Sequence, residues 1–168
     1  GLSKNDALKY ASRVLTTIEV NGTFYRALRP DIYRRWAEET PENFVFAVKG
    51  HRAVCAAAKL AGVGERIAWF MESGVLELGD KLGPLLWQLP PNKKFDREDI
   101  AAFLKLLPPE AKGRRLRHAL EVRHETFVDP AFVEIAAQAR VPIVYADSDD
   151  YPAIADVTGD FVYARLQR

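Results

Sequence analysis

Apolar and polar positions alternate along six short stretches of the chain, and this alternation predicts six β-strands. The stretches lie within residues 13–21, 43–49, 84–89, 117–127, 141–147 and 161–166. Because successive side chains on a strand point to opposite faces, each stretch has one apolar face and one face that ends in a polar residue. The polar residue falls near the carboxyl end of each stretch, as it does in a parallel sheet or barrel with a site at that edge.

Charged and amide side chains share this polar face. The stretch at residues 117–127 is the most informative, because Glu121 and Arg123 lie on one face while Leu120 and Val122 lie on the other. An unpaired charge at the end of a buried strand is costly, so we expect partners from neighbouring strands to meet these two residues. The same parity selects the following side chains for one edge of the sheet: Glu19, Asn21, Lys49, Gln88, Asp147 and Arg165.

Helical patterns separate the strands. Pro30 and Asp31 begin one predicted helix, and apolar residues at helical spacing predict another over residues 65–82, with Gly83 ending it. Further helices are predicted after the N-cap residues Asp96 and Asp129, and a helix start lies at residues 3–6. A longer insertion at residues 50–64 is typical of a functional loop or a short extra helix. Strand and helix therefore alternate as in an α/β fold.

We predict a single α/β domain over residues 1–168 with the architecture of a (β/α)8 TIM barrel. Polar residues on one parity and apolar residues on the other fit a barrel interior better than a sheet between two helical layers. A helix first and a strand last are unusual limits for such a domain. The sequence is therefore interpreted as a fragment that lacks a first strand before Gly1 and a last βα unit after Arg168.

The composition constrains the partners of the chain without naming them. The 24 Lys and Arg residues are balanced by 23 Asp and Glu residues, so the net charge does not indicate nucleic-acid binding. The single cysteine, Cys55, excludes an internal disulfide framework, suits a reducing compartment and is expected to be a small buried hydrophobe. No apolar span reaches membrane length and no secretory signal pattern is present, so we expect a cytoplasmic protein without membrane contacts.

Five motifs in the same order resemble the YecE-like family, also described as domain of unknown function 72. They span nearly the whole chain and read Glu-Val-Asn-Gly-Thr-Phe-Tyr-Arg (residues 19–26), Phe-Ala-Val-Lys (46–49), Leu-Gly-Asp-Lys-Leu-Gly with Leu-Trp-Gln-Leu-Pro-Pro (78–83 and 86–91), Glu-Val-Arg-His (121–124) and Tyr-Ala-Arg-Leu (163–166). The resemblance implies a TIM barrel, of which this chain is a part. The family has no established activity, and it is related to sugar isomerases only by analogy of fold.

Carried over position by position, the polar residues of the family add three further candidates. The resemblance implies that Tyr25, Arg52 and His124 belong to the site together with Glu19, Asn21, Lys49, Gln88, Glu121, Arg123 and Arg165. One departure concerns Cys55 and Ala56, which stand where many members have Thr-His. If that histidine has a role in the family, the role is vacant here or is taken by His51.

Two hypotheses for function follow. In the first, the chain is an enzyme of sugar-isomerase, lyase or hydrolase type, in which Glu19, Glu121 and His124 act on a small polar or anionic, sugar-like substrate by acid/base chemistry. The substrate would be bound by the following residues: Asn21, Tyr25, Lys49, Arg52, Gln88, Arg123, Asp147 and Arg165. A divalent metal held by Glu19, Glu121, Asp147 and His124 is a variant of this hypothesis, although no cofactor is indicated by spacing.

In the second hypothesis, the chain is a binding module for nucleic acid or a protein. Here the arginines of the rim and the aromatic residues Phe24, Tyr25 and Phe127 would form a stacking and phosphate-contacting surface. A structural alternative also stays open, in which Glu121 and Arg123 form only an internal ion pair. His118 lies near the start of its strand, where a solvated role is expected.

Overall fold

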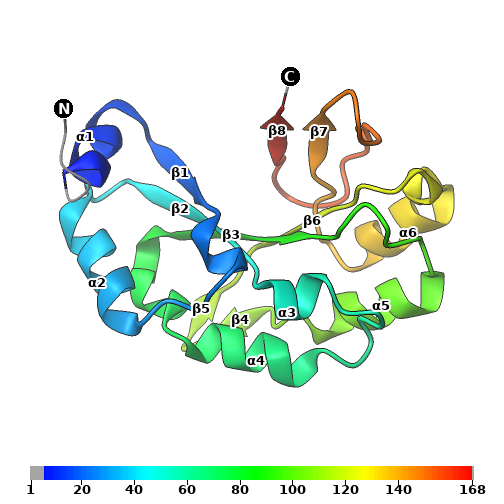
Figure 1. Ribbon diagram of the computed structural model, residues 1–168, viewed down its shortest axis with the longest axis horizontal. Coiled ribbons are helices and arrows are strands. Elements are labelled where there is room, and N and C mark those ends of the chain that lie inside the picture. The colour runs from blue at the N-terminus through cyan, green and yellow to red at the C-terminus, as the bar shows by residue number, and fades with distance from the viewer. Residues whose placement is uncertain (1–5, 168) are drawn as a thin grey trace.

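Four parallel strands form a curved sheet, and a parallel pair of strands lies beside it (Figure 1). The computed structural model describes residues 6–167. Strands β1 (Thr17–Val20), β2 (Val45–Lys49), β3 (Leu82–Gln88) and β6 (His118–Glu121) pair in this order, and every pairing is parallel. The parallel pair β7 (Tyr145–Asp147) and β8 (Ala164–Leu166) continues the sheet beyond β6, through an isolated bridge between Leu120 and Ile143.

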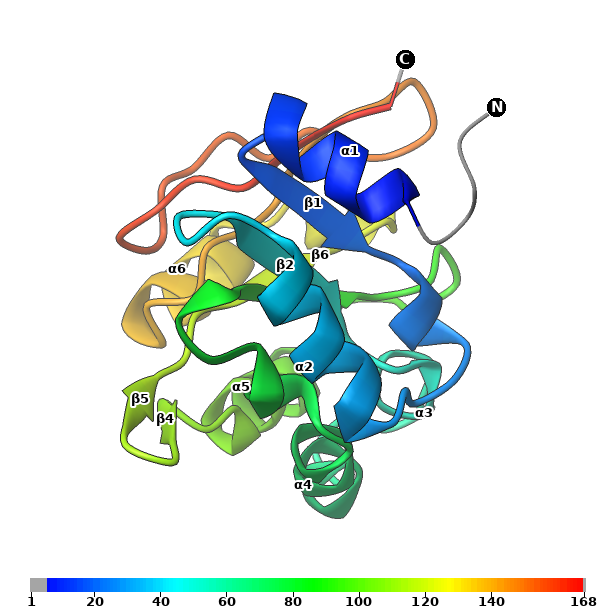
Figure 2. The same cartoon turned by 90° about the vertical axis from the view of Figure 1, so that its left-hand side faces the viewer.

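Helices cover one face of this sheet (Figure 1). The α-helices are α1 (Ala7–Val14), α2 (Pro30–Glu39), α3 (Arg52–Cys55), α4 (Gly64–Glu72), α5 (Arg97–Leu106) and α6 (Pro130–Gln138). The 3-10 helices are η1 (Gly22–Phe24), η2 (Val75–Lys81) and η3 (Glu125–Phe127), and a short hairpin consists of β4 (Glu110–Ala111) and β5 (Arg114–Arg115). Figure 2 shows α1 alongside the edge strand β1.

The main hydrophobic core lies between the sheet and these helices. Phe46, Val48, Trp87 and Leu120 point from the strands into this core, with residues of alternate parity on the other face. The inner face holds a small apolar cluster of Leu86, Ala119 and Val144, against which Phe161 and Tyr163 pack. The sequence pattern of one apolar and one polar face is thus realised, with the apolar face against the helices.

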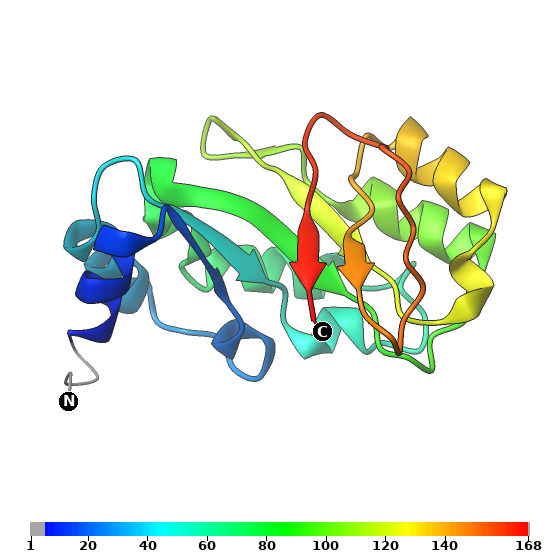
Figure 3. The same cartoon turned by 90° about the horizontal axis from the view of Figure 1, so that it is seen from above.

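The described residues form an open sheet rather than a closed barrel. The outermost strands β1 and β8 make no ladder with each other in the part of the chain described. The sheet nevertheless curves, and the view from above in Figure 3 places β8 between β7 and the side of the molecule that carries β1. The α/β class and the parallel sheet agree with the prediction, whereas barrel closure is not observed.

Helix starts were largely predictable from capping residues. The carboxylate of Asp96 accepts a hydrogen bond from the Asp99 amide at 3.1 Å, and that of Asp129 accepts one from the Ala131 amide at 2.8 Å. Both side chains satisfy amide groups that have no partner within their helix. The predicted start at residues 3–6 falls mostly outside the described residues.

The prediction of one helix over residues 65–82 was wrong. Helix α4 ends at Glu72, and η2 begins only after Gly74, which has a φ of 121°. A positive φ of this size interrupts a right-handed helix and favours glycine. Gly83 does not end a helix but lies inside β3. On α4, Trp69 is 46% exposed, whereas Met71 is buried.

The predicted parity was also wrong for the stretch at residues 141–147. Val144 packs with Leu86 and Ala119 on the inner face, so Ile143 and Tyr145 belong to the outer face and line a cavity with Ile154. Asp147 has the same parity as Ile143 and Tyr145 and therefore does not share a face with Glu121. The amide of Gln167 donates to the backbone carbonyl of Asp147 at 2.9 Å.

No helix among residues 6–167 is both long enough and apolar enough to cross a lipid bilayer.

A charged cluster at the carboxyl edge of the sheet

Glu121 is the centre of the charged cluster predicted at the carboxyl edge. It is the last residue of β6, and its side chain is fully buried. Arg123 Nε donates to Glu121 Oε1 at 2.8 Å, and Arg165 Nη1 donates to Glu121 Oε2 at 2.7 Å. Each carboxylate oxygen thus has its own guanidinium partner, which offsets the cost of removing the charge from water.

Arg165 connects this carboxylate to the opposite edge of the sheet. From β8, its Nε and Nη2 atoms donate to the two carboxylate oxygens of Glu19 on β1, at 3.1 and 2.9 Å. The hydroxyl of Tyr163 also donates to Glu19 Oε2, at 2.7 Å. Burial opposes the positive charge of Arg165, but Glu121 and Glu19 outweigh burial and raise its pKa. Burial and the hydrogen bond to Glu19 raise the pKa of Tyr163, which stays a neutral donor.

Gln88 and Tyr151 complete the packing around Arg123. The Gln88 side-chain oxygen accepts hydrogen bonds from Arg123 Nη2 at 3.0 Å and from Arg165 Nη1 at 3.2 Å. The Tyr151 ring lies under the Arg123 guanidinium at 4.3 Å, and its hydroxyl accepts a hydrogen bond from Arg123 Nη1 at 3.3 Å. These contacts hold both guanidinium groups in fixed orientations.

Lys49 ends β2 beside this network but forms no ion pair with any described residue. Its Nζ atom lies 4.5 Å from the centre of the Phe24 ring, a cation–π distance. Burial and the neighbouring positive charge of Arg165 lower the pKa of Lys49, while Glu121 and Glu19 act in the opposite direction. Lys49 is therefore the cation of the cluster with the fewest direct partners.

The structure does not bring every predicted site residue into this cluster. Asn21 and Tyr25 are exposed at the two ends of η1, and Arg52 is exposed at the start of α3. The His124 Nδ1 atom accepts a hydrogen bond from the Thr126 amide at 3.2 Å and so caps η3. Asp147 lies on the outer face of its strand, away from Glu121. The cluster consists of the following residues: Glu19, Lys49, Gln88, Glu121, Arg123, Tyr151, Tyr163 and Arg165.

The arrangement does not suit the metal ion of the first hypothesis. Among residues 6–167, no three His, Cys, Asp or Glu side chains gather in a way that could hold a metal. Both carboxylates already bind guanidinium groups, and three cationic side chains would repel a further cation. The donor set therefore fits an anion better than a divalent cation.

Cys55 stands where the chain departs from the family pattern, and His51 is the histidine that was expected to be able to take over the role there. Cys55 is fully buried, as predicted, and burial raises the pKa of its thiol to about 12, so the thiol is inert. His51 caps α3 through its Nδ1 atom, which accepts from the Ala53 amide at 3.1 Å, and its ring contacts Trp69 edge-on at 5.0 Å. Burial and Arg52 lower the pKa of His51. Its contacts are those of a capping residue.

The structure contradicts the predictions for Phe127 and His118. Phe127 is fully buried and packs against Phe132, so it is not available for stacking on a nucleic acid. His118 is not solvated: its side chain accepts a hydrogen bond from Trp87 Nε1 at 3.1 Å, and its Nε2 atom lies 2.7 Å from the Pro108 carbonyl. Burial lowers the pKa of His118, which therefore stays neutral in the core.

Tyr163 and Tyr151 were missed as site residues. Tyr163 has the same parity as Arg165, so the strand pattern alone could have included it. Tyr151 comes from the irregular segment between β7 and β8, where no periodicity predicts the direction of a side chain.

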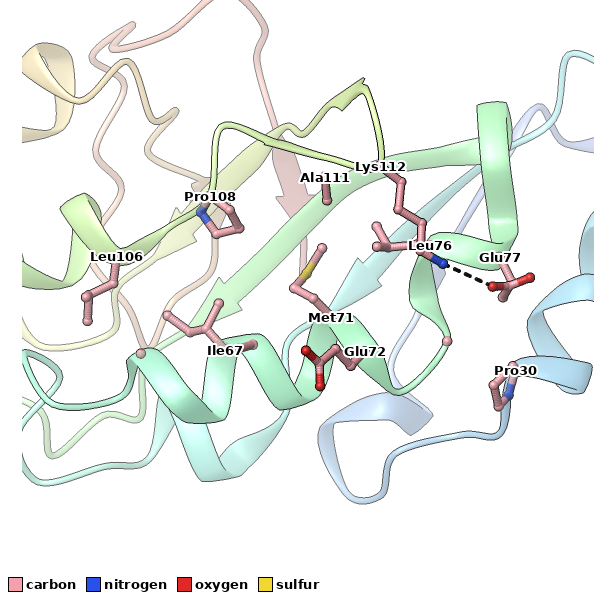
Figure 4. Close-up of a pocket in the computed structure, with 13 residues that line it drawn as sticks. Pro30, Ile67, Met71, Glu72, Leu76, Glu77, Leu106, Pro108, Ala111 and Lys112 are labelled. Atoms are coloured by element: carbon pink, nitrogen blue, oxygen red, sulfur yellow. Dashed lines mark hydrogen bonds and ion pairs between the residues drawn. The ribbon is translucent and has the colours of Figure 1, made fainter.

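A cavity of about 510 Å³ lies at a different place, among α4, η2, the end of α5 and the β4–β5 hairpin (Figure 4). These segments precede β3 and β6, so the cavity is near the amino ends of the strands. Its walls are apolar, with Ile67, Met71 and Leu76 among them, and at its rim Glu77 pairs with Lys112 at 3.4 Å. The charged residues that line it are Glu72, Glu77 and Lys112, and the last two are paired with each other.

The sequence and the fold are similar to those of proteins without an established activity. The UPF0759 protein YecE of Escherichia coli strain K12 is 27% identical over 124 residues, which are 72% of this chain and 43% of that protein. The chain thus spans less than half the length of this curated relative. Solved DUF72 family proteins from Enterococcus faecalis V583 (EF0366) and Thermotoga maritima MSB8 (TM1631) superpose with TM-scores of 0.74 and 0.75, both at 21% identity.

These two superpositions cover 94% and 97% of this chain, and 67% and 65% of the respective solved chains. At this level of identity they establish a shared fold and nothing about function. The profile of the family described as "Protein of unknown function DUF72" matches residues 1–168. The chain therefore belongs to the YecE-like DUF72 family, as the order of its sequence motifs predicted.

Proposed function

We propose that the charged cluster binds a small anionic molecule, such as a phosphorylated or carboxylate-bearing sugar, and that the protein acts on it by acid/base chemistry. The observation that carries this proposal is the charge balance. Lys49, Arg123 and Arg165 supply three cations, while Glu19 and Glu121 supply only two carboxylates. A half-buried site with an excess cation attracts an anion.

Unused hydrogen-bond donors support anion binding. A guanidinium has five N–H donors. Arg123 directs three hydrogen bonds to Glu121, Tyr151 and Gln88, and Arg165 directs four to Glu19, Glu121 and Gln88. Each arginine therefore keeps at least one donor, and the Lys49 ammonium adds its own. Converging charged donors of this kind are the usual ligands of phosphate and carboxylate groups.

The two carboxylates have different environments and hence different proposed roles. Glu121 is fully buried, whereas the side chain of Glu19 is 21% exposed and can be reached by a ligand. We assign Glu19 the role of proton acceptor, with Tyr163 orienting it through a hydrogen bond of 2.7 Å. Glu121 positions Arg123 and Arg165 without touching the substrate.

We also infer that the curved sheet is part of a (β/α)8 barrel. Three features support this inference: the strands of the curved sheet are all parallel, the helices lie outside, and the charged residues gather inside at the carboxyl edge. In barrels of this type the active site occupies that edge. The contact of Arg165 on β8 with Glu19 on β1 shows how far the sheet already curves.

Anion binding can be tested by isothermal titration with inorganic phosphate, with chloride at equal ionic strength as the reference. We expect Lys49→Met to weaken phosphate binding about tenfold or more, because a charge-assisted hydrogen bond contributes on the order of 1.5–3 kcal/mol. Arg52→Met removes an exposed cation outside the cluster and should leave binding unchanged. Equal weakening by both substitutions, or no binding of phosphate or small carboxylates by the wild type, contradicts the proposal.

Proton transfer can be tested across a panel of candidate substrates. Phosphorylated aldoses, ketoses and hydroxy acids are incubated with the protein in D2O, and NMR detects deuterium entering the carbon next to a carbonyl. We expect exchange with at least one compound and its loss in Glu19→Gln, while Glu134→Gln on the surface of α6 keeps it. Exchange that is unchanged in Glu19→Gln would remove Glu19 from the chemistry.

A further inference from the structure

Lys49 differs from the other half-buried lysines of the described chain. Lys81 donates to the Thr40 carbonyl at 2.7 Å, and Lys93 pairs with the Asp99 carboxylate at 2.6 Å. Both amines are held by oxygen atoms. The amine of Lys49 instead faces the ring of Phe24, and no hydrogen bond or ion pair joins it to an oxygen of residues 6–167.

Burial and two neighbouring arginines disfavour the protonated form of Lys49. Burial removes part of the water that would solvate an ammonium group, and Arg165 and Arg123 add positive charge nearby. Glu121 and Glu19 also face Lys49, but both are already paired with these arginines. The net effect is a lowered pKa, so Lys49, which is a cation at rest, gives up its proton and becomes a nucleophile more readily than a solvated lysine does.

We propose that Lys49 is a nucleophile that forms a reversible imine with a carbonyl compound whose phosphate or carboxylate group is bound by the spare donors of Arg123 and Arg165. A primary amine beside cations and an apolar ring, at the carboxyl end of an interior strand, has the features of lysines that react with carbonyl groups. The ligand class is thereby narrowed to phosphorylated aldehydes or ketones and to keto acids. This inference rests on the anion site proposed above.

Imine formation needs only the Lys49 amine, the carbonyl compound and protons from the solvent. The Nζ lone pair of neutral Lys49 forms a bond to the carbonyl carbon, and one of the two amine protons passes to the carbonyl oxygen. The resulting hydroxyl group takes up a second proton and leaves as water, while the remaining amine proton stays on the protonated imine. The positive imine withdraws electrons from the neighbouring carbon, whose proton can then pass to Glu19. Hydrolysis by water reverses the sequence and returns the free amine.

The probe for this amine is pyridoxal 5′-phosphate, which carries both an aldehyde and a phosphate. The full chain is incubated with the probe at pH 7, the imine is reduced with borohydride, and labelled peptides are quantified by mass spectrometry. We expect Lys49 to be labelled at least about tenfold faster than the exposed residues Lys94 and Lys105. Inorganic phosphate should slow the labelling of Lys49 and leave the other two unchanged.

Lys49→Arg is the decisive control, because arginine keeps a positive charge but forms no such imine. The variant should lose the label at this position while phosphate binding, measured by titration, persists. If wild type and variant bind phosphate but Lys49 is labelled no faster than Lys94, the imine is excluded and the anion site stands. If Lys49 reacts quickly but phosphate neither binds nor protects it, the nucleophile stands and the anion site fails.

Discussion

At the scale of single residues, Glu121 is the side chain on which the charged cluster most depends. Its carboxylate is fully buried and bound by Arg123 and Arg165. We expect Glu121→Gln to lower the free energy of unfolding by about 3 kcal/mol, because removing one partner leaves buried charges uncompensated. Urea denaturation followed by circular dichroism measures this loss.

A matched control is provided by the ion pair between Arg97 and Glu134, which joins α5 and α6 at 2.9 Å with both side chains more than half exposed. Glu134→Gln should change the stability little, because exposed pairs are screened by solvent. Similar losses for the two substitutions would mean that Glu121 is not held as the structure shows.

His118 makes the stability depend on pH. It is buried between Trp87 and the Pro108 carbonyl, and burial lowers its pKa below the ordinary value of 6.5. Below pH 6.5 the unfolded chain therefore binds a proton at this position that the folded chain does not. The stabilisation by neutral His118 is complete above pH 6.5 and is lost as the pH falls through and below that value.

We accordingly expect the wild type to lose more stability between about pH 7 and pH 5 than His118→Phe, in which this proton uptake is absent. Urea denaturation at several pH values gives the two slopes. His51→Gln serves as a comparison, because the pKa of His51 is also lowered but its ring is less buried. Parallel pH profiles for wild type and His118→Phe would show that His118 is protonated equally in both states.

At the scale of elements, Gly74 separates α4 from η2. Its φ is 121°, and a Cβ atom at this position would lie 2.6 Å from the Cα atom of Pro30 at the start of α2. We expect Gly74→Ala to destabilise the protein by roughly 1–3 kcal/mol through backbone strain and this clash. Gly62→Ala is the control, since a Cβ there meets no atom within 4 Å. Thermal unfolding of both variants tests the difference.

This junction also shows what the sequence could not reveal. The apolar residues Ile67, Met71, Val75 and Leu78 keep a helical spacing across Gly74, and all are buried, so periodicity alone predicts one helix. The non-helical backbone angles of Gly74, with a φ of 121°, and of Gly79, with a φ of 58°, interrupt it. The β4–β5 hairpin was missed for a similar reason, because its strands have two residues each and its turn, Lys112 and Gly113, is marked only by a glycine.

Burial on both faces explains the error at β7. Ile143, Val144 and Ala146 are all buried, so neither parity stands out as the apolar one, and the side of Asp147 could not be inferred. At β6, in contrast, the charged Glu121 and Arg123 alternate with Leu120 and Val122, and their face was predicted correctly. Cluster residues at strand ends were thus predictable, whereas Tyr151, from an irregular segment, was not.

At the scale of the whole molecule, the β7–β8 pair is joined to the rest of the sheet by few contacts. They include the bridge between Leu120 and Ile143 and the packing of Val144 against the inner face of β3 and β6. Hydrogen bonds from Tyr163 and Arg165 to Glu19 connect the two outermost strands across the inner face, and Arg165 also donates to Gln88 and Glu121. If the charged cluster is the main contact that holds β7 and β8 to the other strands, its removal should increase local opening of β7 and β8 before it unfolds the sheet.

Arg165→Leu tests this expectation by hydrogen–deuterium exchange. We expect the amides of β7 and β8 to exchange about tenfold faster or more, with a smaller change in β2 and β3, because segments with few contacts open locally. Arg115→Leu is the control. It removes an exposed ion pair of 2.7 Å with Asp160, a residue that lies just before β8 in the chain. Uniformly faster exchange in all strands of Arg165→Leu would instead mean that the sheet unfolds as one cooperative unit. The cluster would then stabilise the whole molecule and not only the attachment of β7 and β8.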